Sequence, residues 1–488
     1  MPLETAIVLP STSQPGSRYL LGVCLVASLS GLLFGFDTAV ISGTVRGVTD
    51  QFGLSGWRVG WFASSALLGC LFGAALGGNA SDRFGRKPVL IASAILFLLS
   101  AIGSAIPPTF DWLVLARVVG GVGVGLASVV APTYIAEFAP AATRGRLIAL
   151  YQLSIVVGIL LAYLSNYGLQ LWSDGLQQSP SSFGWINWVV ADEVWRGMFG
   201  AEIAPALLFW LLLHFSPESP RWLILHGQQD RGLKLLRSVQ SETAANNEFQ
   251  AMTKTGSSTT TSWTEVFRPR YRRALIVGVG LSLFGQLSGV NVVVYFGPLI
   301  IESAGFEVDG ALAFQVGFGV INLVFTLLAL FLIDSWGRRP LLIGGMAVVA
   351  TMLFVVGLLF SIQAGAGPSS GPNWTEYAIV GALAIYFASV ALSICAVIWV
   401  LTPEVFPNEI RGRGVSIATF VNWGTNALSV FWFPVLTATF SMQAAFFLFA
   451  LICLVATLFF YYLVPETKGR GLEEIEADWL IGPDRKTT

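Results

Sequence analysis

Two ionisable residues lie inside apolar runs of the first half of the chain, where a charge is costly. Asp37 falls within LFGFDTAVISG and Arg117 within LVLARVVGGVGVG. A charge at the middle of a membrane helix costs on the order of 3 kcal/mol on insertion scales, so such residues usually serve a function. A carboxylate that can exchange a guanidinium partner for a proton can act as a switch. We interpret Asp37 and Arg117 as a proton-coupling pair, with a fixed structural ion pair as the alternative.

Amide and aromatic side chains also recur inside the apolar runs. Amides and hydroxyls can replace the hydrogen bonds that water gives a polyol, and indole rings can cover its apolar faces. The candidate substrate-binding residues are Gln152, Gln286, Asn291, Tyr295, Asn322, Trp399, Asn422 and Trp423. Gly289 lies between two of them and permits a local break in its helix. For a single residue of this set, a polar contact between helices is the alternative.

The composition indicates the environment in which these residues lie. Of the 488 residues, 55% are hydrophobic and 11% are charged, whereas a soluble chain carries about 25% charged residues. We therefore expect an all-α membrane protein. The net charge of −1 argues against a nucleic-acid partner. The two histidines, the four scattered cysteines and the absence of a nucleophile–base pair or nucleotide loop predict no metal, no cofactor and no enzymatic activity.

Twelve segments are apolar and long enough to cross a bilayer, which takes about 20 residues. In the first half they are 19–43, 57–78, 88–106, 111–136, 146–170 and 196–215. In the second half they are 272–303, 311–333, 340–362, 376–401, 412–437 and 442–464.

The loops between these segments predict the orientation. Lys and Arg gather at 83–87, 144–146, 216–271, 338–339 and 411–413. The opposite loops, at 171–195, 304–310, 363–375 and 438–441, contain neither. The positive-inside rule then places both termini in the cytoplasm of a multi-pass protein of the cell membrane. Asn373, in NWT, fits the N-glycosylation pattern on the outer side.

Three ordered sequence matches indicate a duplicated six-span unit. DRFGRKP at 82–88 matches DSWGRRP at 334–340, EFAPAATRGR at 137–146 matches EVFPNEIRGR at 404–413, and PESPR at 217–221 matches PETKGR at 465–470. Repeats of this kind place a transporter's substrate site between the two halves.

The expected organisation has five parts. They are an N-terminal cytoplasmic tail (1–18), a six-helix bundle (19–215), a cytoplasmic insert (216–271), a second six-helix bundle (272–464) and a C-terminal tail (465–488). In the insert, RWLILHGQQDRGLKLLRSV has helical spacing, and TKTGSSTTTS at 253–262 predicts a flexible linker.

Nine stretches in order resemble the sugar porter family of the major facilitator superfamily, and the resemblance covers nearly the whole chain. They are GFDTAVISG, GGNASDRFGRKP, ARVVGGVGVGLAS, YIAEFAPAATRGRL, PESPRWL, GQLSGVNVVVY, DSWGRRP, PEVFPNEIRGRG and PETKGRGLEEIE. The resemblance implies a twelve-helix major facilitator fold. It also implies alternating-access transport of monosaccharides or related polyols, by proton symport or by facilitated diffusion.

The resemblance also implies residue roles. Proton symporters of the family carry an Asp–Arg pair at the positions of Asp37 and Arg117, whereas facilitators typically have Asn at the Asp position. Tyr295 occupies an outer-gate position. The sugar-contacting positions are those of Gln152, Gln286, Asn291, Asn322 and Trp399.

The chain departs from the family pattern at the sugar site. Gly285 replaces one of two glutamines, Cys395 and Ala396 replace a Gly–Pro hinge, Asn422 replaces a Gln, and Ile159 replaces a Gln of some members. An amide that is lost cannot recognise its hydroxyl. The sequence therefore does not specify glucose as the substrate.

Charges at the inner helix ends form a third set, which resembles the family's cytoplasmic salt-bridge network; solvated helix ends are the alternative. The candidate gate residues are Asp82, Arg83, Arg86, Glu137, Arg144, Glu218, Arg221, Asp334, Arg338, Arg339, Glu404 and Arg411. Glu218 and Arg221 are expected to tie the insert to the network.

The leading hypothesis is a monomeric importer of a hexose or pentose that moves with protons and works in the lipid bilayer. A sugar or polyol uniporter, in which Asp37 is structural, is the first alternative. A transporter-like sugar sensor is the second, although sensors usually have tails longer than the 24 residues that follow position 464.

Overall fold

The structure is a computed structural model that describes residues 17–140, 143–254, 263–366, 374–407 and 409–468. Most of the two predicted tails and of the 253–262 linker, Asn373 and the side chain of Asp334 lie outside the described residues. Within the described ranges the chain is helical and has no strand.

The first half contains six spans. Long apolar helices form because backbone groups in a membrane must find their hydrogen-bond partners within the chain. They are α1 (Ser17–Phe52), α2 (Gly56–Phe84), α3 (Arg86–Ala105), α4 (Phe110–Phe138) and α5 (Arg144–Gln178), followed by α7 (Val194–Gly200) and α8 (Ile203–Phe215), which together make the sixth span.

The second half also contains six spans, two of them interrupted. The broken spans are α12 (Arg272–Leu287) with α13 (Val290–Ser303), and α16 (Trp374–Leu392) with α17 (Ile394–Val405). The continuous ones are α14 (Val308–Trp336), α15 (Arg338–Ala366), α18 (Arg411–Thr439) and α19 (Met442–Leu463).

The predicted all-helical, twelve-span architecture is confirmed, with a difference at α18. Eleven segments of the described chain are both long and apolar enough to cross a membrane, and α18 is not among them. It is a continuous helix of 29 residues, but Asn422, Asn426 and several hydroxyl residues lower its apolarity. Both asparagines are buried, so their amides lie inside the protein and not against lipid.

The predicted loop at 171–195 is largely helical, which corrects the expected end of the fifth span. α5 continues eight residues beyond position 170, to Gln178. It is followed by the short α6 (Gly184–Ile186) and the π-helix η1 (Asn187–Asp192). Polarity alone suggested a loop, but LWSDGLQQ contains no proline and continues the helix.

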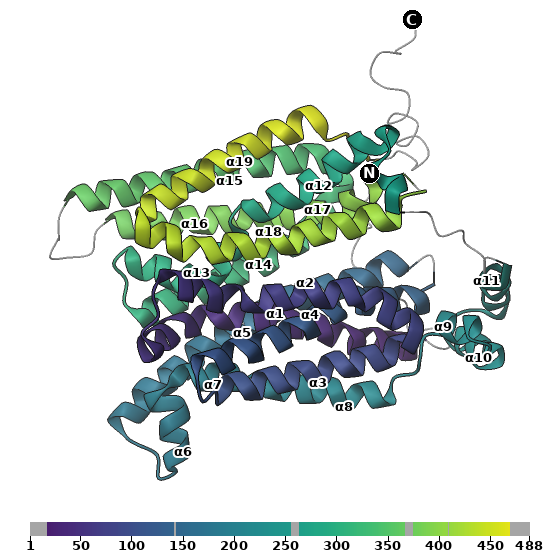
Figure 1. Ribbon diagram of the computed structural model, residues 1–488, viewed down its shortest axis with the longest axis horizontal. Coiled ribbons are helices and arrows are strands. Elements are labelled where there is room, and N and C mark those ends of the chain that lie inside the picture. The colour runs from purple at the N-terminus through teal and green to yellow at the C-terminus, as the bar shows by residue number, and fades with distance from the viewer. Residues whose placement is uncertain (1–16, 141–142, 255–262, 367–373, 408, 469–488) are drawn as a thin grey trace, which may run out of the picture.

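The two halves lie side by side in Figure 1, with α1–α8 below and α12–α19 above. Their contacts follow the repeat: α2 packs against α18, α5 against α14, and α1 against α13. The second helix of each half thus meets the fifth helix of the other. The site predicted between the halves must lie among these helices.

The segment at 216–271 folds into a small helical unit, which we call the insert. It contains α9 (Pro220–Leu225), α10 (Gln229–Val239), α11 (Glu242–Lys254) and the 3₁₀-helices η2 (Trp263–Phe267) and η3 (Pro269–Tyr271). Ile224, Leu236 and Ala245 form its core. The stretch with helical spacing is two helices and not one, because Gly227 adopts φ +82° between them.

The insert defines the two ends of the molecule. α9–α11 lie at one end of the bundle, at the right of Figure 1, which we call the insert end. α6 lies at the opposite end, which we call the far end.

Candidate functional site

Asp37 and Arg117 lie in contact inside the first half. Asp37 belongs to α1 and Arg117 to α4, and their exposed fractions are 2% and 1%. Arg117 donates through Nη1 to Asp37 Oδ1 and through Nη2 to the Asp37 carbonyl oxygen, at 3.1 Å. The ring of Phe199, on α7, lies 5.4 Å from the guanidinium carbon. Charge, hydrogen bonding and an aromatic face together hold the guanidinium in place.

Glu202 is a second carboxyl beside this pair, and the sequence analysis missed it. It lies at the start of α8, is buried, and interacts with both Asp37 and Arg117. Neither of its oxygens accepts a hydrogen bond from the described residues. Two carboxyls and one guanidinium are neutral only when one carboxyl carries a proton, and an uncompensated buried charge is costly. The cluster can therefore hold one exchangeable proton.

Glu202 escaped notice because the predicted sixth span begins at position 196, which put this residue near a presumed solvent-exposed end. In the structure α7 begins at Val194 and packs against α1 and α3, so Glu202 is well inside the bundle. The sequence did contain a signal for it, because Glu202 is an acidic residue inside the predicted span 196–215.

Three of the predicted polar residues form a chain of amides in the second half. Asn291 donates to Gln286 Oε1 at 2.7 Å, and Gln286 donates to Asn422 Oδ1 at 2.9 Å. They come from α13, α12 and α18. Among the described residues, the amide nitrogen of Asn422 and the carbonyl of Asn291 have no further partner, which leaves a donor at one end and an acceptor at the other. Such a chain can present both kinds of group to a hydroxyl-rich molecule.

A broken helix positions this amide chain. Gly289 has φ +83°, a left-handed conformation that favours glycine, and separates α12 from α13. The Tyr386 hydroxyl donates to the carbonyl of Ser288 at 3.0 Å, which satisfies one backbone group at the break. The break lets Gln286 and Asn291 face each other although they lie in different helices.

Trp423 follows Asn422 in the sequence and contacts the other half. It is buried, and its ring centroid is 5.6 Å from that of Phe34, on α1. Tyr295, one turn beyond Asn291, is also buried and interacts electrostatically with Arg117 and Asp37.

The structure does not join the other three predicted binding residues to the amide chain. Gln152, on α5, is partly exposed. Asn322 accepts a hydrogen bond at 3.4 Å from Thr326 of its own helix, α14. Trp399, on α17, is 50% exposed. Their predicted roles rest on the family resemblance.

At the insert end, the duplicated motifs fold into two matching hydrogen-bond clusters. In the first half, Glu218 accepts from the backbone N–H groups of Arg86, Lys87 and Ser219. In the second half, Glu466 accepts from those of Arg338, Arg339, Thr467 and Lys468. Each carboxylate therefore caps the start of a helix, where free N–H groups favour an anion.

Two glycines make room for these carboxylates. Gly85 has φ +102° and Gly337 has φ +96°, and each precedes the capped helix. A Cβ on Gly85 would lie 2.3 Å from Glu218 Oε2, and one on Gly337 would lie 2.7 Å from Glu466 Oε2. A larger residue at either position would displace the capping group.

Each cluster also contains an ion pair between helices of the same half. Arg86 binds Glu137 at 2.9 Å and Asp82 at 3.1 Å, and Ser219 donates to Glu137 at 2.5 Å. In the second half, Thr467 donates to Glu404 at 2.6 Å, and the Arg338 Nη2 atom lies 3.8 Å from Glu404.

The remaining predicted gate residues divide into two groups. Arg339 donates to the Tyr461 carbonyl at 2.6 Å, Arg411 to the Pro403 carbonyl at 3.0 Å, and Arg144 lies 3.6 Å from Glu248 of the insert. Arg83 is exposed over Phe84, and Arg221 is exposed on α9, so the structure does not bring these two into the clusters. Glu218, and not Arg221, ties the insert to the first half, because only the carboxylate can accept from the exposed N–H groups.

The halves contact each other at the far end through an ion pair that the sequence analysis did not anticipate. Arg46, near the end of α1, binds Glu302, near the end of α13, at 2.6 Å. The Tyr163 hydroxyl donates to the Val294 carbonyl at 3.4 Å, from α5 to α13. At the insert end, the ion pairs between described residues of the two clusters each lie within one half. The Arg46–Glu302 and Tyr163–Val294 contacts join the two halves.

Two six-helix halves related by repeated motifs, with a buried charge cluster and a chain of amides between broken helices, define a secondary transporter of the major facilitator superfamily. The sugar (and other) transporter family matches residues 23–479. The chain belongs to this family.

The chain matches individual relatives along almost their whole length. The chain is 38% identical to the D-xylose–proton symporter of Escherichia coli (strain K12), over 98% of both chains. It is 34% identical to the arabinose–proton symporter of Bacillus subtilis (strain 168), over 96% of this chain and 97% of the relative. A partially occluded inward-open structure of the xylose transporter XylE from E. coli matches it with a TM-score of 0.78 and 36% identity, over 93% of this chain and 100% of that one.

Proposed function

We propose that the chain is a secondary active transporter that imports a monosaccharide, a hexose or a pentose, together with protons by alternating access. The single observation that carries this proposal is the buried contact between Asp37 and Arg117. Relatives named as xylose–proton and arabinose–proton symporters, at 38% and 34% identity, support the same substrate class.

Proton coupling follows from the charge balance of the cluster. When Asp37 is ionised, it holds Arg117, and with it α4, against α1. A proton that arrives from outside neutralises Asp37, releases the guanidinium and loosens the packing of α1 against α4. After the sugar leaves on the inner side, loss of that proton restores the pair. Glu202, which interacts with both residues, is the second group on which the proton can reside.

Sugar binding is assigned to the amide chain together with the predicted aromatic residues. Asn422 offers a free donor and Asn291 a free acceptor, and a sugar hydroxyl can satisfy both kinds of group. Trp423, which follows Asn422 in α18, is a large aromatic surface among the predicted residues. Gln152, Asn322 and Trp399 complete the site from α5, α14 and α17 when the halves change position.

We assign the alternating access of the site to the two sides of the membrane to a rocking of the two halves. In the structure described here, Arg46–Glu302 and the contacts of α1 with α13 hold the far end closed. The two clusters at the insert end act as inner gates, and each stabilises its own half. We place the insert end in the cytoplasm and the far end outside the cell, because the basic loops all lie at the insert end.

The remaining assignments follow from this function. We place the protein in the cell membrane with both termini in the cytoplasm, as a monomer with the five parts predicted above. Sugar and protons are its ligands, and the family to which it belongs transports and does not catalyse. We assign it no enzymatic activity and no cofactor.

Transport into vesicles tests the proposal. The protein is reconstituted, an inward proton gradient is imposed, and the uptake of labelled xylose, arabinose, glucose and galactose is compared for the wild type and Asp37→Asn. We expect the wild type to accumulate at least one sugar above its equilibrium level, and Asp37→Asn to exchange that sugar without accumulating it. Accumulation by both proteins would contradict the role of Asp37. Equilibration alone by the wild type would indicate a uniporter, and binding without flux a sensor.

A further inference from the structure

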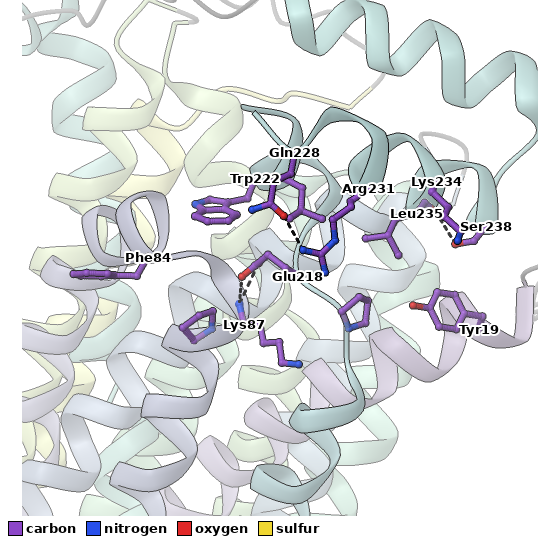
Figure 2. A pocket seen from close by; sticks show the side chains of 13 residues that line it. Tyr19, Phe84, Lys87, Glu218, Trp222, Gln228, Arg231, Lys234, Leu235 and Ser238 are labelled. Carbon is purple, nitrogen blue, oxygen red and sulfur yellow. Dashed lines mark hydrogen bonds between the residues drawn. The ribbon is translucent and has the colours of Figure 1, made fainter. Parts of the chain in front are cut away.

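A cavity of about 800 Å³ lies between the insert and the first half. Its walls come from α1, α2 and α3 of the first half and from α9 and α10 of the insert, and Figure 2 shows the residues that line it. Small-molecule sites in proteins usually have volumes of roughly 300–1,000 Å³, so the cavity can hold a compact ligand. It lies at the insert end and is separate from the charge cluster and the amide chain.

Three cations line the cavity: Lys87, Arg231 and Lys234. Lys87 Nζ donates to the carbonyl of His214 at 3.0 Å, and Arg231 Nη1 donates to Gln228 Oε1 at 2.8 Å. These partners are neutral, and among the described residues none of the three cations has a carboxylate within 4.0 Å.

Glu218, the one acid in the cavity wall, carries a single negative charge against these three cations. Its oxygens accept from the backbone N–H groups of Arg86, Lys87 and Ser219, so its hydrogen-bonding capacity is used by the helix cap. The cavity therefore has an excess of positive charge. Arg231 and Lys234 are three residues apart on α10, lie on one helix face and both line the cavity.

The ends of the neighbouring spans place the cavity at the surface of the membrane. α1 begins at Ser17, α2 ends at Phe84, α3 begins at Arg86 and α8 ends at Phe215, all next to residues that line the cavity. Phe84 is 58% exposed and Phe215 is 85% exposed, as expected for residues that meet lipid. Tyr19 adds an aromatic ring with a polar tip, which suits the interface between lipid and water.

We propose that this cavity binds a phosphate group, and that the group belongs to the headgroup of an anionic phospholipid of the inner leaflet. Lys87, Arg231 and Lys234 pair with the phosphate, and the exposed aromatic residues contact the upper part of the acyl chains. Because no free carboxylate remains to bind an ammonium group, the site prefers phosphatidylglycerol to phosphatidylethanolamine and phosphatidylcholine. A bound headgroup joins α10 to α3 and so holds the insert against the first half.

Lipid binding to the purified full-length chain tests this inference without requiring transport. Native mass spectrometry counts the phosphatidylglycerol and phosphatidylcholine molecules that bind to the wild type in a non-ionic detergent. We expect phosphatidylglycerol to bind more tightly, and its affinity to fall about tenfold in Arg231→Gln/Lys234→Gln, because two cations near an anionic headgroup are lost. The control Arg237→Gln/Arg268→Gln removes two cations whose ion pairs, with Glu242 and Glu265, lie outside the cavity wall, and it should bind like the wild type.

Further measurements separate the possible results. Lys234→Glu, which reverses a charge at an exposed position, should weaken binding more than Lys234→Gln if the cavity holds an anion. If an excess of inorganic phosphate displaces phosphatidylglycerol, the site accepts phosphate from solution as well; if it does not, the lipid headgroup is the ligand. Equal phosphatidylglycerol affinities in the pocket variant and the control variant would overturn the inference, as would equal binding of phosphatidylcholine by the wild type.

Discussion

At the scale of single residues, the function depends on how the buried charges compensate one another. Asp37 and Arg117 come from α1 and α4, Glu202 directly precedes α8, and no pair of them is close in sequence. Removing one partner of a buried ion pair leaves an uncompensated charge, whereas removing both leaves none. Their contributions to stability therefore cannot be additive.

Arg117→Gln tests this coupling. We expect the variant to lose about 3 kcal/mol of unfolding free energy, because Asp37 is left buried without its cation. Asp37→Asn/Arg117→Gln should regain most of that loss. Denaturant unfolding of the purified protein, followed by tryptophan fluorescence, gives the comparison. Equal losses in the single and double variants would show that the pair does not stabilise the fold.

Gln286→Ala tests the amide chain. Gln286 accepts from Asn291 and donates to Asn422, so its removal leaves both without their partner. We expect KM for the transported sugar to rise about tenfold, which corresponds to roughly 1.4 kcal/mol. Initial uptake rates over a range of sugar concentrations give KM. Gln250→Ala makes the same chemical change at an exposed position of α11 and should leave KM unaltered.

Residue types were easier to predict than residue contacts. Asp37 and Arg117 could be singled out because charges are rare in apolar runs, and Gln286, Asn291 and Asn422 because amides are rare there. The sequence could place Glu202 within a span but could not show that it joins the charges, because that depends on how the helices pack. The sequence also could not distinguish the three amides that bond to one another from Gln152 and Asn322, which lie outside that chain. Which amides meet depends on how the helices cross.

At the scale of elements, broken helices and end contacts determine the geometry. Gly289 adopts a left-handed backbone conformation that an L-residue adopts only with strain. Gly289→Ala should lower the unfolding free energy by about 1 kcal/mol and raise KM, because Asn291 moves relative to Gln286. Thermal unfolding and uptake kinetics measure the two effects. Gly381→Ala, at an open helical position of α16, should leave both unchanged or raise stability slightly.

The ion pair at the far end should set the balance between conformations. Arg46→Glu places two acids face to face across α1 and α13, so we expect the far end to open in a larger fraction of molecules. Distances between spin labels in the loops that follow α1 and α18 would report the opening. Arg46→Glu/Glu302→Arg restores an ion pair of opposite polarity and should return the distances towards those of the wild type. Unchanged distances in Arg46→Glu would show that other contacts close this end.

The number and order of the spans were predictable, but several helix ends were not. Apolar length identifies a span because a bilayer requires it, although α18, whose asparagines are buried, is less apolar than the other eleven spans of the described chain. It gave no guidance beyond the membrane, where α5 continues to Gln178 and where Gly227 divides the insert into α9 and α10. There, helix ends depend on single backbone conformations and on packing.

At the scale of the whole molecule, the internal repeat is the feature that the sequence revealed most completely. The repeated motifs align Glu137 with Glu404. In the structure each of these carboxylates accepts a hydrogen bond from a hydroxyl group and forms an ion pair with an arginine. The same alignment contained Glu466 opposite Glu218, but its role became clear only from the helix N–H groups that it caps.

The repeat predicts equal consequences for equivalent changes. Glu218→Ala and Glu466→Ala each remove a carboxylate that caps a helix at the insert end, so each should lose about 1–3 kcal/mol of unfolding free energy. The two losses should agree within about 1 kcal/mol if the environments are equivalent. Glu242→Ala, at the exposed start of α11, should have almost no effect. A large loss in only one of the two variants would show that the clusters have different roles.

The position of these two clusters has a mechanical consequence. Each carboxylate joins a helix start to the chain that closes the same half, so both clusters travel with their half as it tilts. The work of changing state then falls on the contacts between the two halves, which are the packed helix pairs α2–α18, α5–α14 and α1–α13 and ion pairs such as Arg46–Glu302. Substitutions at the contacts between the halves alone could accordingly make turnover faster or slower, while the stability of each half stays the same.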